Sequence, residues 1–176
     1  MQRAAMAVFL ATTVLLGVLA QPGYADDPCT AFKWNVAHER ALFAGAPERV
    51  AAGRDVASGP QLLPDRLYGL SLFPQDQITL SVPLGKKAQF GGALGGFARV
   101  HVPTAGTYRI ALDQSGWIDV VGEHGAMPSS DFAGGNACNA PHKLVQFELP
   151  AGELSLQLSG VASAAVKIAL TSISDR

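Results

Sequence analysis

Hydrophobic and polar residues alternate along most of the chain beyond Leu67. Alternation with a period of two places one set of side chains in a core and the other in water, which is typical of β-strands with one buried face. Eight stretches follow this pattern: residues 67–73, 77–83, 96–103, 107–113, 116–122, 143–150, 153–160 and 164–172. They predict a mainly β fold, an antiparallel β-sandwich or jelly roll of about eight strands with one short N-terminal helix.

The alternation also predicts which side chains face inward. Hydrophobic residues at every second position are expected in the core: Tyr68, Leu70, Leu72, Ile78, Leu80, Val82, Ala98, Val100, Val102, Tyr108, Ile110, Leu112, Ile118, Val120, Val145, Phe147, Leu149, Leu154, Leu156, Leu158, Val166, Ile168 and Leu170. The residues between them, such as Ser155, Gln157 and Ser159, are expected to face water. Residues 74–76, Pro-Gln-Asp, predict a hairpin between the first two strands.

A secretory signal peptide is expected over residues 1–25. Arg3 precedes a run without charge, and small residues lie before the expected cleavage site after Ala25. Cleavage leaves 12 basic and 14 acidic side chains, and no basic stripe, which argues against nucleic acid as a partner. No second long apolar run follows. We therefore expect a periplasmic or secreted protein that is not attached to a membrane after cleavage.

Residues 26–66 are expected to form an N-terminal arm, and residues 67–176 the sandwich domain. Within the arm, Asn35 can cap a short helix near residues 35–45. Two Gly-Gly pairs interrupt residues 82–97, which predicts either a mobile loop over a binding face or a plain linker between strands.

The chain contains two cysteines, Cys29 and Cys138. In an oxidising compartment such a pair is most simply a disulfide, and this one would close a loop of about 110 residues. It would tie the arm to the start of the strand at 143–150. The alternative is a reduced Cys138 whose thiolate is activated by His142, which requires a lowered thiol pKa.

The run from about residue 96 to residue 172 resembles the bacterial pre-peptidase C-terminal (PPC) type of secreted β-sandwich. The motifs that carry the resemblance are "FARVHVPTAGTYRIAL", "GWIDVV" and "KLVQFELPAGELSLQL", in which a strand ends in proline, small residues and glycine. The chain departs from that family in having one aspartate, Asp119, where two are usual. The resemblance implies an accessory or binding module without catalytic residues.

The chain as a whole is also similar to short exported bacterial proteins with "HERALFAG", a central "PQD" and a late "APHKLVEFELPAG"-like run. Some of these are labelled homogentisate 1,2-dioxygenase, and that label implies iron held by two histidines and a carboxylate. The candidate ligands are Glu123, His124 and His142, which lie at the ends of expected strands. The alternative is three surface residues near turns.

The residues around Glu123 and His124 suggest no other catalytic site. The stretch 122–135 also contains Ser129, Ser130 and Asp131, but it lacks the G-x-S-x-G motif of many serine hydrolases. It is expected to be a turn-rich loop.

The outward residues suggest a binding surface. Arg99, His101 and Arg109 are expected to share one face of adjacent strands, where they could recognise a carboxylate. Aromatic residues could stack on a sugar or an aromatic group: Tyr68, Phe90, Phe97 and above all Trp117. The first hypothesis is a non-catalytic module without a cofactor that binds a glycan, a cell-envelope component or a protein. The alternative is a small metal-dependent enzyme, with iron as its metal.

Overall fold

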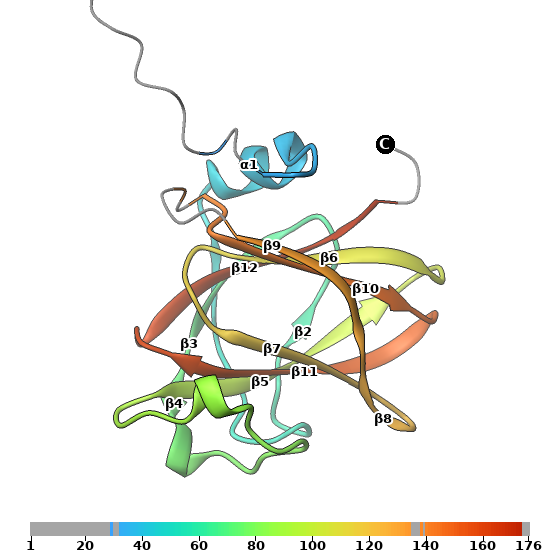
Figure 1. The fold of residues 1–176 in the computed structure, drawn as a ribbon. Helices are drawn as coiled ribbons and strands as arrows, with labels where there is room; N and C mark the ends of the chain where they lie inside the picture. Colours follow the sequence, from blue (N-terminus) through green and yellow to red (C-terminus); the bar gives the residue numbers. More distant parts are fainter. Residues whose placement is uncertain (1–28, 30–31, 135–137, 139, 174–176) are drawn as a thin grey trace, which may run out of the picture.

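The computed structural model describes residue 29, residues 32–134, residue 138 and residues 140–173. The expected signal peptide, residues 1–25, lies outside the described residues. Two β-sheets stack face to face (Figure 1), which confirms the predicted mainly β sandwich. The described chain contains no helix long and apolar enough to span a membrane.

Sheet A has the strand order β1-β3-β12-β6-β10-β9, and sheet B has the order β2-β5-β11-β7-β8 with β4 paired to β5. Most neighbouring strands are antiparallel, whereas β1–β3 and β2–β5 are parallel pairs. The strands have these bounds: β1 Glu48–Ala51, β2 Gln61–Leu62, β3 Leu67–Ser71, β4 Phe73–Pro74, β5 Leu94–Val102, β6 Gly106–Leu112, β7 Trp117–Gly122, β8 Gly125–Met127, β9 Ser129–Gly134, β10 Lys143–Leu149, β11 Gly152–Val161 and β12 Ala165–Ser172.

The core lies between the two sheets and is formed by the predicted alternation. Inward residues of β5, β6, β10, β11 and β12 belong to one buried cluster, which contains Val100, Ile110, Phe147, Leu156 and Ile168. Each of these side chains is no more than 1% exposed. The period of two therefore predicts correctly which side chains of every long strand face inward.

Residues 77–83 do not form the predicted strand, so the predicted hairpin is wrong. The chain forms the short helix η2 (Gln75–Gln77) and then runs along the outer face of sheet B. The backbone N–H groups of Ser81 and Val82 donate to Oε1 of Gln157 at 2.8 and 3.3 Å, and Nε2 of Gln157 donates to the carbonyl of Val82 at 3.1 Å. Gln157 is fully buried as a result, although the alternation predicts it in water. The side-chain amide of Gln157 thus makes the hydrogen bonds that these residues would make with a neighbouring strand in a sheet.

Two further segments differ from expectation. Residues 125–134 form β8 and β9 instead of a turn-rich loop, and the chain passes from sheet B to sheet A between them. Within the expected N-terminal arm, β1 and β2 join sheets A and B. The sandwich therefore includes residues that precede Leu67.

Residues 32–43 of the N-terminal arm cover the outer face of sheet A. Helix α1 (Ala37–Phe43) confirms the predicted helix, and Asn35 Oδ1 accepts a hydrogen bond from the N–H of Ala37 at 3.0 Å. The helix lies over the sheet that contains β6, β10 and β12 (Figure 1). Val36 and Phe43 pack with residues of that face in a second buried cluster, against which Phe32 and Trp34 also pack.

A buried carboxylate joins α1 to the sheet. Glu39 is 2% exposed, and its Oε1 accepts a hydrogen bond from Thr171 Oγ1 at 3.0 Å. Arg109 Nη1 lies 3.4 Å from the same oxygen and donates to the carbonyl of Asn35 at 3.1 Å. Because a buried charge needs such partners, the sequence pattern of α1 alone would not have placed Glu39 inside.

The disulfide between Cys29 and Cys138 confirms the predicted pairing. The two Cα atoms are 4.9 Å apart and the cysteines are separated by 109 positions in the sequence. Cys138 is fully buried. Neither cysteine is therefore available as a thiolate nucleophile, and the alternative with a reactive Cys138 is wrong.

Replacing both cysteines with serine will lower the free energy of unfolding. The chain-entropy model for a loop of this length gives an upper value of about 4–5 kcal/mol. Urea unfolding of the oxidised protein and the double variant measures the difference. Equal stability of the two proteins, or two titratable thiols in the native unreduced protein, would contradict the assignment.

Gln157→Leu will destabilise the protein by about 1–3 kcal/mol, because the buried amide of Gln157 is lost and the backbone N–H groups of Ser81 and Val82 lose their acceptor. Gln146→Leu is the matched control, since Gln146 lies on β10 with a partly exposed side chain; it should change stability by less than about 0.5 kcal/mol. Urea unfolding measures both, and amide exchange should accelerate at Ser81 in the Gln157 variant alone. Equal effects of the two substitutions would show that Gln157 does not hold this segment.

Candidate ligand-binding site

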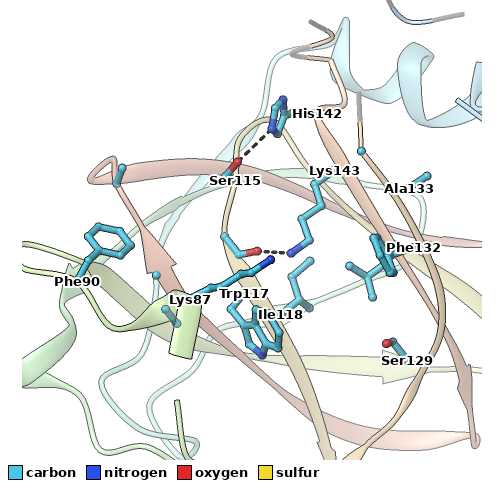
Figure 2. A pocket seen from close by; sticks show the side chains of 16 residues that line it. Lys87, Phe90, Ser115, Trp117, Ile118, Ser129, Phe132, Ala133, His142 and Lys143 are labelled. Carbon is cyan, nitrogen blue, oxygen red and sulfur yellow. Dashed lines mark hydrogen bonds between the residues drawn. The ribbon is translucent and has the colours of Figure 1, made fainter. Parts of the chain in front are cut away.

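A cavity of about 870 Å³ opens at one side of the sandwich, where the start of β7 faces β9 and β10 (Figure 2). Its walls come from the short helix η3 (Lys86–Ala88), the segment 115–118, β9, the start of β10 and the turn at 160–162. The lining residues are Lys87, Ala88, Phe90, Ser115, Gly116, Trp117, Ile118, Ser129, Phe132, Ala133, Gly134, His142, Lys143, Val145, Gly160 and Ala162. A volume of this size is typical of small-molecule sites.

Exposed aromatic side chains gather at this cavity. The described part of the chain has five exposed large hydrophobic residues, and three of them line the cavity: Phe90, Trp117 and Phe132. Their exposed fractions are 46%, 39% and 69%. Since single exposed hydrophobic residues are common but clusters are not, this grouping marks the cavity as a candidate binding surface.

Trp117 is held in place by contacts on two sides. Its Nε1–H donates to Oδ1 of Asp119 at 3.0 Å. A Cβ placed on Gly85 would lie 3.3 Å from the indole, so the backbone there packs directly against the ring. The indole is therefore a fixed, partly exposed surface, which reduces the entropy that a stacked ligand would cost.

Asp119 is a partly buried carboxylate behind that indole. Burial raises the pKa of Asp119 above its usual range, while hydrogen bonds from Trp117 and Gln157 and the charge of Lys143 act in the opposite direction. Its second oxygen, Oδ2, is buried without a hydrogen-bond partner among the described residues. The carboxylate therefore fixes Trp117 and does not itself line the cavity.

Lys143 places an ammonium group in the cavity wall. It is the first residue of β10 and lies two positions before the inward residue Val145, so its side chain continues the inward row where the core ends. Its Nζ donates to the carbonyl of Gly116 across the gap between the sheets and lies 5.7 Å from the centre of the Trp117 ring (Figure 2). Burial lowers the pKa of Lys143 below the usual lysine value, and the charge of Asp119 partly offsets this.

His142 and Ser115 form the polar rim of the same wall. His142 Nδ1 lies 3.1 Å from the carbonyl oxygen of Cys138, which can only accept, so the neutral ring carries its proton on Nδ1. Nε2 then accepts the hydroxyl of Ser115 at 3.1 Å. This is the pairing of a nucleophile with its base. Acyl transfer also needs donors aimed at an oxyanion, and the pairing of Ser115 with His142 alone does not provide them.

The predicted cationic patch is not a single surface. Arg99 and His101 lie on β5 in sheet B, whereas Arg109 lies on β6 in sheet A. Arg99 Nε donates to the carbonyl of Gly59 at 3.0 Å, and His101 lies 2.6 Å from Glu153. Arg109 lies beneath the arm, with its guanidinium 4.5 Å above the ring of Trp34. The three residues face different surroundings because consecutive strands of a sandwich can belong to opposite sheets.

Of the residues expected to stack on a ligand, Trp117 and Phe90 line the cavity. Tyr68 and Phe97 are 3% and 0% exposed and belong to the interior. Expecting them at the surface is therefore wrong. Tyr68 packs in the core between the sheets, whereas Phe97 lies opposite Gln157 on the outer face of sheet B and is buried there.

The three expected metal ligands are not brought together. His142 lies near Ser115, just before β7, whereas Glu123 and His124 follow the other end of that strand. Six residues of strand separate the two places, about 20 Å. Among the described residues no group of three or more histidine, cysteine, aspartate or glutamate side chains is arranged to hold a metal ion.

Lys143 and Phe132 were not among the expected site residues. The sequence does contain a signal for Lys143. This lysine lies two positions before the inward residue Val145, so the alternation places it on the inward row. No comparable signal marks Phe132, whose position depends on the pairing of β9 with β10, where it lies opposite Val145.

No protein-family model matches the chain, and no curated protein matches its sequence. The resemblance to PPC modules therefore stays a prediction, as does the similarity to the exported proteins with a dioxygenase label. The cavity residues themselves provide the basis for inferring a function.

The emission of Trp117 will titrate with Asp119. In a Trp34→Phe variant, where Trp117 is the remaining tryptophan, we expect a fluorescence transition at a pH above the usual aspartate value of 3.8. The transition should be lost when Asp119→Asn is added. A transition at or below 3.8, or one that survives Asp119→Asn, would contradict the contact.

The raised pKa of Asp119 also determines how the ionisation of this residue changes the free energy of unfolding with pH. Because the pKa of Asp119 is higher in the folded state, the folded protein binds more protons between the usual value and the raised one. The contribution of Asp119 therefore favours the fold at low pH and declines as pH rises through that window.

Proposed function

We propose that the protein is an exported, non-catalytic binding module that takes a carbohydrate in the cavity beside Trp117. The observation that carries the proposal is the gathering of Phe90, Trp117 and Phe132 around one cavity. Sugar rings present C–H faces that pack on aromatic rings, and the hydroxyl oxygens of Ser115 and Ser129 supply hydrogen-bonding groups at the same place.

Two features support export. The disulfide between Cys29 and Cys138 fits an oxidising compartment. Residues 1–25 have the pattern of a secretory signal peptide. Together they favour the periplasm or the extracellular space, where glycans and other cell-envelope components are available as ligands.

The accessory role fits the resemblance to PPC modules, which implies binding without catalysis. The competing hypothesis of a metal-dependent enzyme loses its main support, because Glu123 and His124 lie far from His142. The hydrogen bond between Ser115 and His142 is a separate reason to test for catalysis. Labelling with a fluorophosphonate tests directly whether Ser115 is a reactive nucleophile.

Oligosaccharides prepared from bacterial envelopes will change the fluorescence of Trp117. The change should persist in Trp34→Phe and disappear in Trp117→Phe, because Trp34 belongs to the arm and does not line the cavity. Trp117→Phe keeps an aromatic ring but removes the hydrogen-bond donor to Asp119, so urea unfolding first establishes that the variant is folded. Binding of active oligosaccharides should weaken about tenfold by calorimetry, a typical loss for one stacking contact.

Two results would overturn the proposal. The first is that no oligosaccharide of such a collection binds, or that binding persists in both tryptophan variants. The second is catalysis: stoichiometric labelling of Ser115 by a fluorophosphonate, or one iron per chain in untagged protein, would favour an enzyme.

A further inference from the structure

The charges around the cavity have one sign. Among its described lining residues, Lys87, His142 and Lys143 are the titratable groups, and none is an aspartate or a glutamate. The chain as a whole carries slightly more acidic than basic residues. A cavity whose lining carries two lysines and no carboxylate is therefore a local feature of this surface.

Lys143 has hydrogen-bonding capacity to spare. An ammonium group has three N–H donors, and in the described part of the chain Lys143 Nζ has one acceptor, the carbonyl of Gly116. The opposite charge that acts on it is that of Asp119, whose carboxylate accepts a hydrogen bond from Trp117. A partly buried cation with free donors is favourable to an anion that enters the cavity.

Lys87 adds a second cation from the other wall. It lies on η3, which packs on the outer side of sheet B, and its side chain extends into the cavity (Figure 2). Lys87 and Lys143 thus flank the same space with the Trp117 indole between the walls. Two ammonium groups act as point charges that accept a compact anion in several orientations, unlike the fixed fork of an arginine.

We propose that the ligand of this cavity is an acidic saccharide, whose sugar ring stacks on Trp117 while its carboxylate pairs with Lys143 and Lys87. This inference rests on the proposed function and adds the charge of the ligand to it. Hydrogen bonds between charged groups are stronger than those between neutral ones. The carboxylate therefore determines which saccharides bind, and the aromatic rings contribute to all of them.

Pairs of oligosaccharides that differ only at the carboxyl group provide the test. Short oligomers of galacturonate, glucuronate and mannuronate are compared by calorimetry with their own methyl esters, which keep the rings and remove the carboxylate charge. At least one acid is expected to bind ten times more tightly than its ester or better. Its affinity should fall with added salt, and as pH rises through the lowered pKa of Lys143, below the usual value of 10.5.

Matched variants assign the effect to the two lysines. Lys143→Met and Lys87→Met should each weaken binding of the acid about tenfold more than they weaken binding of the ester. Lys86→Met is the control, because Lys86 lies beside Lys87 on the same short helix but does not line the cavity. Lys86→Met should bind both compounds as the unaltered protein does.

The outcomes separate this inference from the proposed function. If acid and ester bind equally, or if neutral oligosaccharides bind and no acid does, the inference is wrong and the carbohydrate module stands. If no saccharide of either kind binds, both are wrong. If all three lysine variants lose affinity equally, the discrimination comes from general surface charge, and the assignment to Lys143 and Lys87 fails.

Discussion

The wall of the cavity depends on the disulfide between Cys29 and Cys138. The disulfide fixes Cys138 beside the start of β10, and the carbonyl of Cys138 orients the ring of His142. Lys143 follows directly and begins the strand. A single covalent bond therefore holds both the N-terminal arm against sheet A and the polar residues of the cavity in register with β7.

The cavity begins where the hydrophobic core ends. Along β10 the inward row runs from Leu149 and Phe147 through Val145 to Lys143, and the first three are buried. At Lys143 the opposing sheet presents the carbonyl of Gly116 instead of a hydrophobic side chain. The alternation that places hydrophobic side chains in the core thus also places the ammonium group of Lys143 at the edge of the core. Its partial burial costs solvation free energy, which structural stability alone does not explain.

The period of two predicted the fold class and the inward face of each long strand, and the presence of two cysteines in an expected exported protein predicted the disulfide. The period failed where a side chain makes the backbone hydrogen bonds that a neighbouring strand would make, as Gln157 does for residues 81 and 82. It also failed where the partner sheet mattered, because no pattern along β5 or β6 shows that Arg99 and Arg109 lie on opposite sheets. Of the site, Trp117 was predicted from its residue type; the cavity around it depends on the pairing of β9 with β10, which the local sequence does not encode.

The most direct test of the cavity as the binding site is amide chemical-shift mapping with a bound acidic oligosaccharide on isotopically labelled protein. The account predicts the largest shifts at Lys87, at residues 115–118, at Phe132 and at Lys143. Shifts concentrated instead around Arg99 and His101, or beneath the arm around Glu39, would show that the ligand is bound elsewhere and would contradict it.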